Sequence, residues 1–175
     1  MNKPQLVTSH SAASGPVQFY LPTAQDSEHT PYRMADLATG AQLFIWSIRK
    51  WLQIRRFPGK FDSQLFEAHQ RIRAPEAAEA IEECMALLSV SALRTVIVEC
   101  PCQTHLSCDE LTLLNVCRAL QSGHDEAAEK AIARLIRGRL GRIYCRSARD
   151  YGVALAKAGF PLTRITKLKV AEVSP

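Results

Sequence analysis

Apolar residues recur at every third or fourth position through most of this chain, which is the repeat that places side chains on one face of an α-helix. The clearest case is Ala77, Ile81, Cys84 and Leu88, which follows Pro75, a residue favoured at the first position of a helix. Similar repeats predict further helices over residues 39–56, 63–71, 107–121, 125–136 and 141–158. We therefore predict an all-α fold, a compact bundle of five to six helices.

Three segments fall outside this repeat. Residues 93–99 are rich in β-branched side chains and predict one short extended segment. Residues 1–35 are rich in Ser, Thr and Pro, and without a periodic apolar face they predict a flexible N-terminal arm. Residues 163–175 form a basic C-terminal tail, which leaves residues 36–162 as the helical domain.

The N-terminus lacks the apolar stretch of a signal peptide, and no apolar run reaches the length of a transmembrane helix. We therefore predict a cytoplasmic protein without a membrane partner. Because thiols are kept reduced in that compartment, we expect the six cysteines to be free thiols rather than disulfides.

Four potential metal ligands lie within nine residues: Cys100, Cys102, His105 and Cys108. Thiolate and imidazole are ligands that zinc prefers, so this cluster is a candidate zinc site, and zinc is the one cofactor that the sequence suggests. The spacing is unusual, because structural zinc sites draw two ligand pairs from separate segments. Ligands from neighbouring helices would then have to complete the site.

Two other interpretations of this cluster remain open. In the first, the cysteines are small buried side chains beside a helix start, where Ser107 and Glu110 match a capping box and Cys117 lies on the apolar face. In the second, the cluster is redox-active, because a thiol at a helix N-terminus such as Cys108 has a stabilised thiolate. One of the two upstream cysteines would then be its resolving partner.

Charge is unevenly distributed along the chain, although the net charge is only +5. Residues 61–129 carry four Lys or Arg against twelve Asp or Glu, whereas residues 130–175 carry eleven against two. Helical spacing places four arginines of the second segment on one face: Arg139, Arg142, Arg146 and Arg149. This arginine strip is a candidate contact for an anion or for nucleic-acid phosphates. The alternative is that it pairs with the acidic helix near residues 76–83, or is merely solvated.

The predicted helix over residues 39–56 carries apolar residues on two sides, with Phe44 and Ile48 on one and Trp46 and Ile54 near the other. Such a helix is either central in a bundle or exposes a contact surface. Trp46 and Ile54 are therefore candidate protein-interface residues.

The sequence lacks the motifs of dinucleotide-binding folds, phosphate-binding loops, zinc proteases and serine hydrolases, and it assigns no catalytic residue. We therefore predict a non-enzymatic protein-interaction or regulatory module that binds a protein partner or forms a homo-oligomer. The alternatives are a cysteine-based metal-binding or redox-sensing protein centred on residues 100–108, and a nucleic-acid-binding accessory protein that uses the arginine strip.

Overall fold

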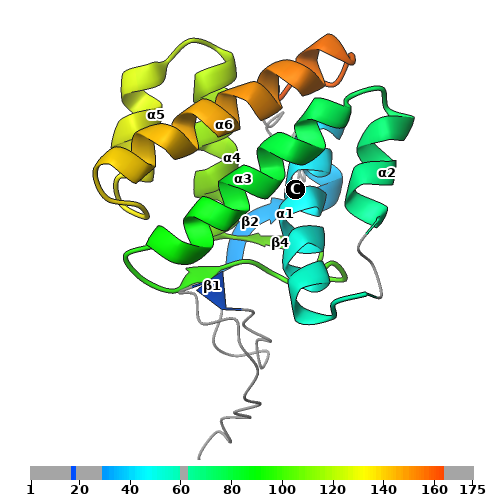
Figure 1. Cartoon of the computed structure of the whole chain (residues 1–175), viewed down its shortest axis with the longest axis horizontal. Coiled ribbons are helices and arrows are strands. Elements are labelled where there is room, and N and C mark those ends of the chain that lie inside the picture. Colours follow the sequence, from blue (N-terminus) through cyan, green and yellow to red (C-terminus); the bar gives the residue numbers. More distant parts are fainter. Residues whose placement is uncertain (1–16, 19–28, 60–62, 164–175) are drawn as a thin grey trace, which may run out of the picture.

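The computed structural model describes residues 17–18, 29–59 and 63–163, which form a bundle of α-helices (Figure 1). The all-α prediction is confirmed. The helices are α1 (Thr39–Arg56), α2 (Gln64–Arg71), α3 (Pro75–Ser91), α4 (Cys108–Gln121), α5 (Asp125–Ile132) and α6 (Arg139–Lys157), with a short 3-10 helix, η1, at Met34–Asp36.

The core forms where α3 and α6 run side by side and α4 packs against α6 (Figure 1). The apolar series predicted for α3 is buried, including Ile81 and Leu88 with no exposed surface. From α6, Tyr144, Ala148 and Tyr151 are buried against it. Burial of these facing stripes supplies most of the favourable free energy of a bundle of this kind.

Within the described residues, four short strands accompany the helices, where the sequence predicted one extended segment. The predicted segment contributes β3 (Val96–Ile97), which pairs in parallel with β1 (Val17–Gln18). The second sheet joins β2 (His29–Arg33) to β4 (His105–Ser107) in antiparallel orientation. Both N-terminal strands therefore pair with strands that flank Cys100 and Cys102.

Residues 29–36 are structured, unlike the flexible arm predicted for residues 1–35. The hydroxyl of Thr30 donates to the carbonyl of Leu106 at 3.0 Å, and the amide of Met34 donates to the carbonyl of Thr104 at 2.8 Å. These partners lie 70 and 76 residues away, so local composition carries no sign of them. The rest of the predicted arm, apart from β1, and the tail beyond residue 163 lie outside the described residues.

Two helix boundaries differ from prediction around residues 133–140. Helix α5 ends at Ile132 because Leu135 and Ile136 turn to the end of α3, where the carbonyl of Leu135 accepts a hydrogen bond from the amide of Leu93. Gly138, with φ at +65°, then redirects the chain into α6, which begins at Arg139 rather than Gly141. None of the helices in the described ranges is both long and apolar enough to cross a bilayer.

Candidate functional site

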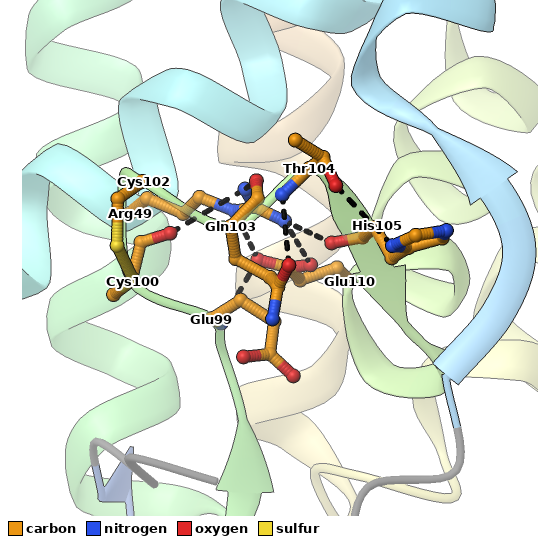
Figure 2. The surroundings of a disulfide bond; sticks show 8 residues. All are labelled: Arg49, Glu99, Cys100, Cys102, Gln103, Thr104, His105 and Glu110. Carbon is orange, nitrogen blue, oxygen red and sulfur yellow. Dashed lines mark hydrogen bonds and ion pairs between the residues drawn. A yellow bond between two sulfur atoms is a disulfide. The ribbon is translucent and has the colours of Figure 1, made fainter. Parts of the chain in front are cut away.

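The loop between β3 and β4 carries a disulfide that joins Cys100 to Cys102 across Pro101 (Figure 2). The two Cα atoms lie 5.4 Å apart, within the usual range for a disulfide. Cys100 is half-buried and Cys102 is exposed. The prediction that all six cysteines are free thiols is therefore wrong for this pair. It rested on the redox state expected of a compartment, whereas one intervening residue places the two sulfurs within bonding reach.

A buried ion pair lies directly beneath this loop. Two guanidinium nitrogens of Arg49 donate to the carboxylate of Glu110, Nε to Oε1 at 2.7 Å and Nη2 to Oε2 at 2.8 Å. The two side chains are 2% and 0% exposed. Removing both charges from water is costly, and only such a two-bond geometry with further hydrogen bonds compensates for it.

The remaining donors of Arg49 supply those further bonds, and all of them reach the disulfide loop (Figure 2). Nη1 donates to the carbonyl of Gln103 at 2.5 Å and, more weakly, to that of Cys100 at 3.5 Å. Nη2 donates to the carbonyl of His105 at 2.8 Å. A residue from the middle of α1 thus holds the backbone of the loop on both sides of the disulfide.

Glu110 holds the two ends of the same loop through its remaining lone pairs. Its carboxylate accepts the amide of Glu99 at 3.1 Å and the amide of Ser107 at 2.9 Å. The hydroxyl of Ser107 in turn accepts the amide of Glu110 at 3.0 Å, which confirms the predicted capping box at the start of α4. Glu110, the acidic residue of the capping box, is therefore also the counter-ion of Arg49.

The structure joins two of the four predicted metal ligands and does not gather all four. The ring of His105 accepts from Nε of Arg33 at 3.3 Å and lies 3.3 Å from the hydroxyl of Thr104. Cys108 is exposed at the first position of α4. Among the residues that the structure describes, no group of three or more His, Cys, Asp or Glu side chains is placed to hold a metal ion. The zinc hypothesis therefore gains no support from this arrangement.

The three cysteines within α3, α4 and α6, Cys84, Cys117 and Cys145, are buried. Cys117 has no exposed surface and its thiol donates to the carbonyl of Ala148 at 3.0 Å, as expected of a small core side chain. Burial raises the pKa of the Cys84 and Cys117 thiols far above the ordinary value, and it raises the pKa of Cys145 to about 11. These three thiols are therefore poor nucleophiles.

The predicted arginine strip divides into two parts. Arg139, Arg142 and Arg146 are exposed on α6. Arg149 is half-buried, and its guanidinium pairs with the carboxylate of Asp125 on α5 at 2.5 Å. The acidic partner of Arg149 is therefore on α5, rather than on the helix near residues 76–83.

The two predicted interface residues do not share one surface patch. Trp46 is half-buried and lines a cavity of about 340 Å³ with Met34 and Leu43. Ile54, also half-buried, lines a separate cavity of about 250 Å³ with Phe66. Their role in a protein interface stays a prediction.

A buried polar cluster in the core was missed by sequence reasoning. Ser47, His69 and Tyr151 come from α1, α2 and α6, and the hydroxyls of Ser47 and Tyr151 lie 3.2 Å apart. Ser47 donates to the carbonyl of Leu43, and His69 Nδ1 donates to the carbonyl of Leu65 at 2.8 Å. A serine beside a histidine suggests a nucleophile and its base, but these side chains are at most 1% exposed and closed to a substrate. The cluster satisfies core polar groups.

The chain matches no protein-family model, no curated protein and no solved structure, so a proposal about its function has to rest on the geometry of the disulfide loop.

Proposed function

We propose that this protein is a redox-responsive regulatory module in which Cys100 and Cys102 are the sensing pair. The observation that carries the proposal is the disulfide itself: it is formed across a single residue, reaches the surface through Cys102, and lies in a loop held by a buried ion pair. Exposed disulfides are the ones that exchange with thiols, whereas buried ones resist reduction.

The size of the closed loop argues against a purely structural role. In the chain-entropy model, a crosslink stabilises a fold by an amount that grows with the number of residues it encloses. A three-residue loop corresponds to about 1.6 kcal/mol at 25 °C, against roughly 4.7 kcal/mol for a loop of one hundred residues. A disulfide between Cys100 and Cys102 ties together no distant parts of the bundle. As a stabilising crosslink it is therefore weak.

The exchange chemistry needs only a low-molecular-weight thiol as reductant. Its thiolate attacks the exposed sulfur of Cys102, which forms a mixed disulfide and releases the thiolate of Cys100 to take up a proton. A second thiol then attacks the mixed disulfide, which frees the thiol of Cys102 and yields the oxidised dimer of the reductant. Two electrons and two protons pass to the protein.

The ion pair makes this exchange reversible. Glu110 binds the amide of Glu99 just before the pair, and Arg49 binds the carbonyl of Gln103 just after it. Neither bond involves a sulfur atom, so both persist when the disulfide is reduced. The two thiols then stay close together, and reoxidation requires little reordering of the chain.

The output of such a module is a change in binding at the loop surface rather than catalysis. Strands β3 and β4 flank the sensing pair, and they also hold β1 and β2 of the N-terminal segment. A change in the loop therefore has a direct route to the N-terminal strands, which fits the regulatory class predicted from the sequence.

A redox titration of the full chain tests this proposal. The protein is equilibrated in glutathione buffers of graded potential, quenched with a thiol-alkylating reagent, and analysed by peptide mass spectrometry. We expect Cys100 and Cys102 to titrate together as one two-electron couple with a midpoint above about −300 mV, the value below which structural disulfides fall.

The matched control is the exposed thiol outside the pair. Cys108→Ser should leave the midpoint unchanged, whereas Cys102→Ser should abolish the couple. A pair that stays oxidised below −300 mV, or one that is fully reduced in every buffer, would show that the proposal is wrong.

A further inference from the structure

Five exposed arginines surround the turn between α5 and α6: Arg134, Arg137, Arg139, Arg142 and Arg146. Among the described residues, none of their guanidinium groups makes an ion pair or a side-chain hydrogen bond. Several arginines elsewhere are neutralised, as Arg94 is by Asp109 and Arg149 is by Asp125. Uncompensated positive charge is thus concentrated at this turn, which we call the arginine surface.

From residue 130 onward, the chain adds to this charge rather than cancelling it. Residues 130–163 contain eight Lys or Arg against one Asp. The surface also includes the N-terminal end of α6, where the helix dipole has its positive pole. Arg139 and Arg142 line a cavity of about 250 Å³ between α5 and α6, together with the single carboxylate of Glu129. An anion at this place meets a net positive potential.

We infer that the arginine surface binds the phosphate backbone of a double-stranded nucleic acid without reading its sequence. Arg139, Arg142 and Arg146 are three and four residues apart, so they share one face of α6 and span about 10 Å along its axis. A DNA duplex carries one phosphate charge for every ~1.7 Å of its axis, so several phosphates lie within that span. The planar guanidinium group also binds phosphate with two hydrogen bonds.

Features of α6 favour a duplex over two other polyanions. Single strands bind where bases stack on exposed aromatic rings, but the rings of α6, Tyr144 and Tyr151, are buried. Binding of an amphipathic helix to an anionic membrane also gains strength from an apolar face that enters the lipid. The apolar face of α6 packs against α3 and α4, which leaves Leu140 and Val153 as its large exposed apolar residues.

The test measures fluorescence anisotropy of a labelled 25-base-pair DNA duplex of mixed sequence, titrated with the full chain between 50 and 200 mM NaCl. The logarithm of the association constant should fall with the logarithm of salt by about 0.9 for each phosphate contacted. Three contacts from α6 give a slope of about −2.7, and all five arginines give about −4.5. The variant R139Q/R142Q/R146Q should make the slope less steep by about 2.7.

Two matched variants separate position from total charge. R55Q/R71Q/R73Q removes the same charge from the α1–α2 side of the bundle, far from the α5–α6 turn in Figure 1, and should keep the slope. R139K/R142K/R146K keeps the charge and should also keep the salt slope. Three results would overturn the inference. Binding could be undetectable at 50 mM NaCl, or it could weaken equally in R55Q/R71Q/R73Q. The protein could also prefer single strands or vesicles of anionic lipid to the duplex. Because the assay needs no redox change, it is independent of the proposed disulfide switch.

Discussion

Replacing Arg49 with methionine tests whether the buried ion pair holds the disulfide loop in place. The substitution keeps a long side chain but leaves Glu110 buried with no counter-ion, since its side chain is 0% exposed. It also removes the strong donors to the carbonyls of Gln103 and His105. Breaking a buried pair by removing one partner costs about 3–5 kcal/mol. For a chain of this length, that corresponds to a fall in melting temperature of roughly 6–20 °C.

The assay is urea denaturation followed by circular dichroism, with the midpoint and the slope fitted separately. We expect a lower midpoint at an unchanged slope, which indicates a change in stability rather than in the denatured state. The control is Arg55→Met, because Arg55 pairs with Glu82 at the surface, where the two side chains are 55% and 47% exposed. Losing such a surface pair should cost at most about 1 kcal/mol.

A double variant distinguishes the charge from the loop contacts. In R49M/E110L neither charge of the pair remains, but the loop carbonyls and the amides of Glu99 and Ser107 still lose their partners. We therefore expect it to be less destabilised than the sum of the two single variants. If Arg49→Met costs no more than Arg55→Met, the ion pair does not hold the loop, and the argument for a preorganised sensing pair fails.

Two further predictions concern the core. Burial lowers the pKa of His69 in the native state, so below about pH 6.5 the unfolded chain binds a proton that the native state does not. The free energy of unfolding should therefore fall as the pH falls, by up to about 1.4 kcal/mol per pH unit, until the pKa of His69 in the native state is reached. Urea midpoints from pH 7.5 to 5.0 check this, and His69→Gln should flatten the profile. Gly40→Ala should destabilise the fold by about 1–3 kcal/mol, because a Cβ there would collide with the carbonyls of Phe160 and Pro161. Thermal unfolding against Thr39→Ala, at an exposed neighbouring position, checks that effect.

The helices were predictable because their signals are local. The apolar repeat of α3 and the Ser107–Glu110 capping box depend on residues three or four positions apart, and both are confirmed. The strands were not predictable, because each strand depends on a pairing partner far along the chain. Residues 29–33 contain His, Pro and Arg and give no β pattern, yet they pair with residues 105–107. Local propensity is a weak guide where long-range pairing decides the structure.

The same distinction explains how the cysteine cluster was interpreted. The spacing of Cys100, Cys102, His105 and Cys108 shows which residues are near one another in sequence, but not which way the loop turns. That direction is set by Arg49, which lies 51 residues upstream of Cys100 and which the sequence presents as one more cation on an apolar helix. Its burial could have been suspected only from its position between Ile48 and Trp51, both core residues. The ion pair from a distant helix binds the loop backbone on either side of the two cysteines, so the geometry of the disulfide depends on the fold as well as on the spacing.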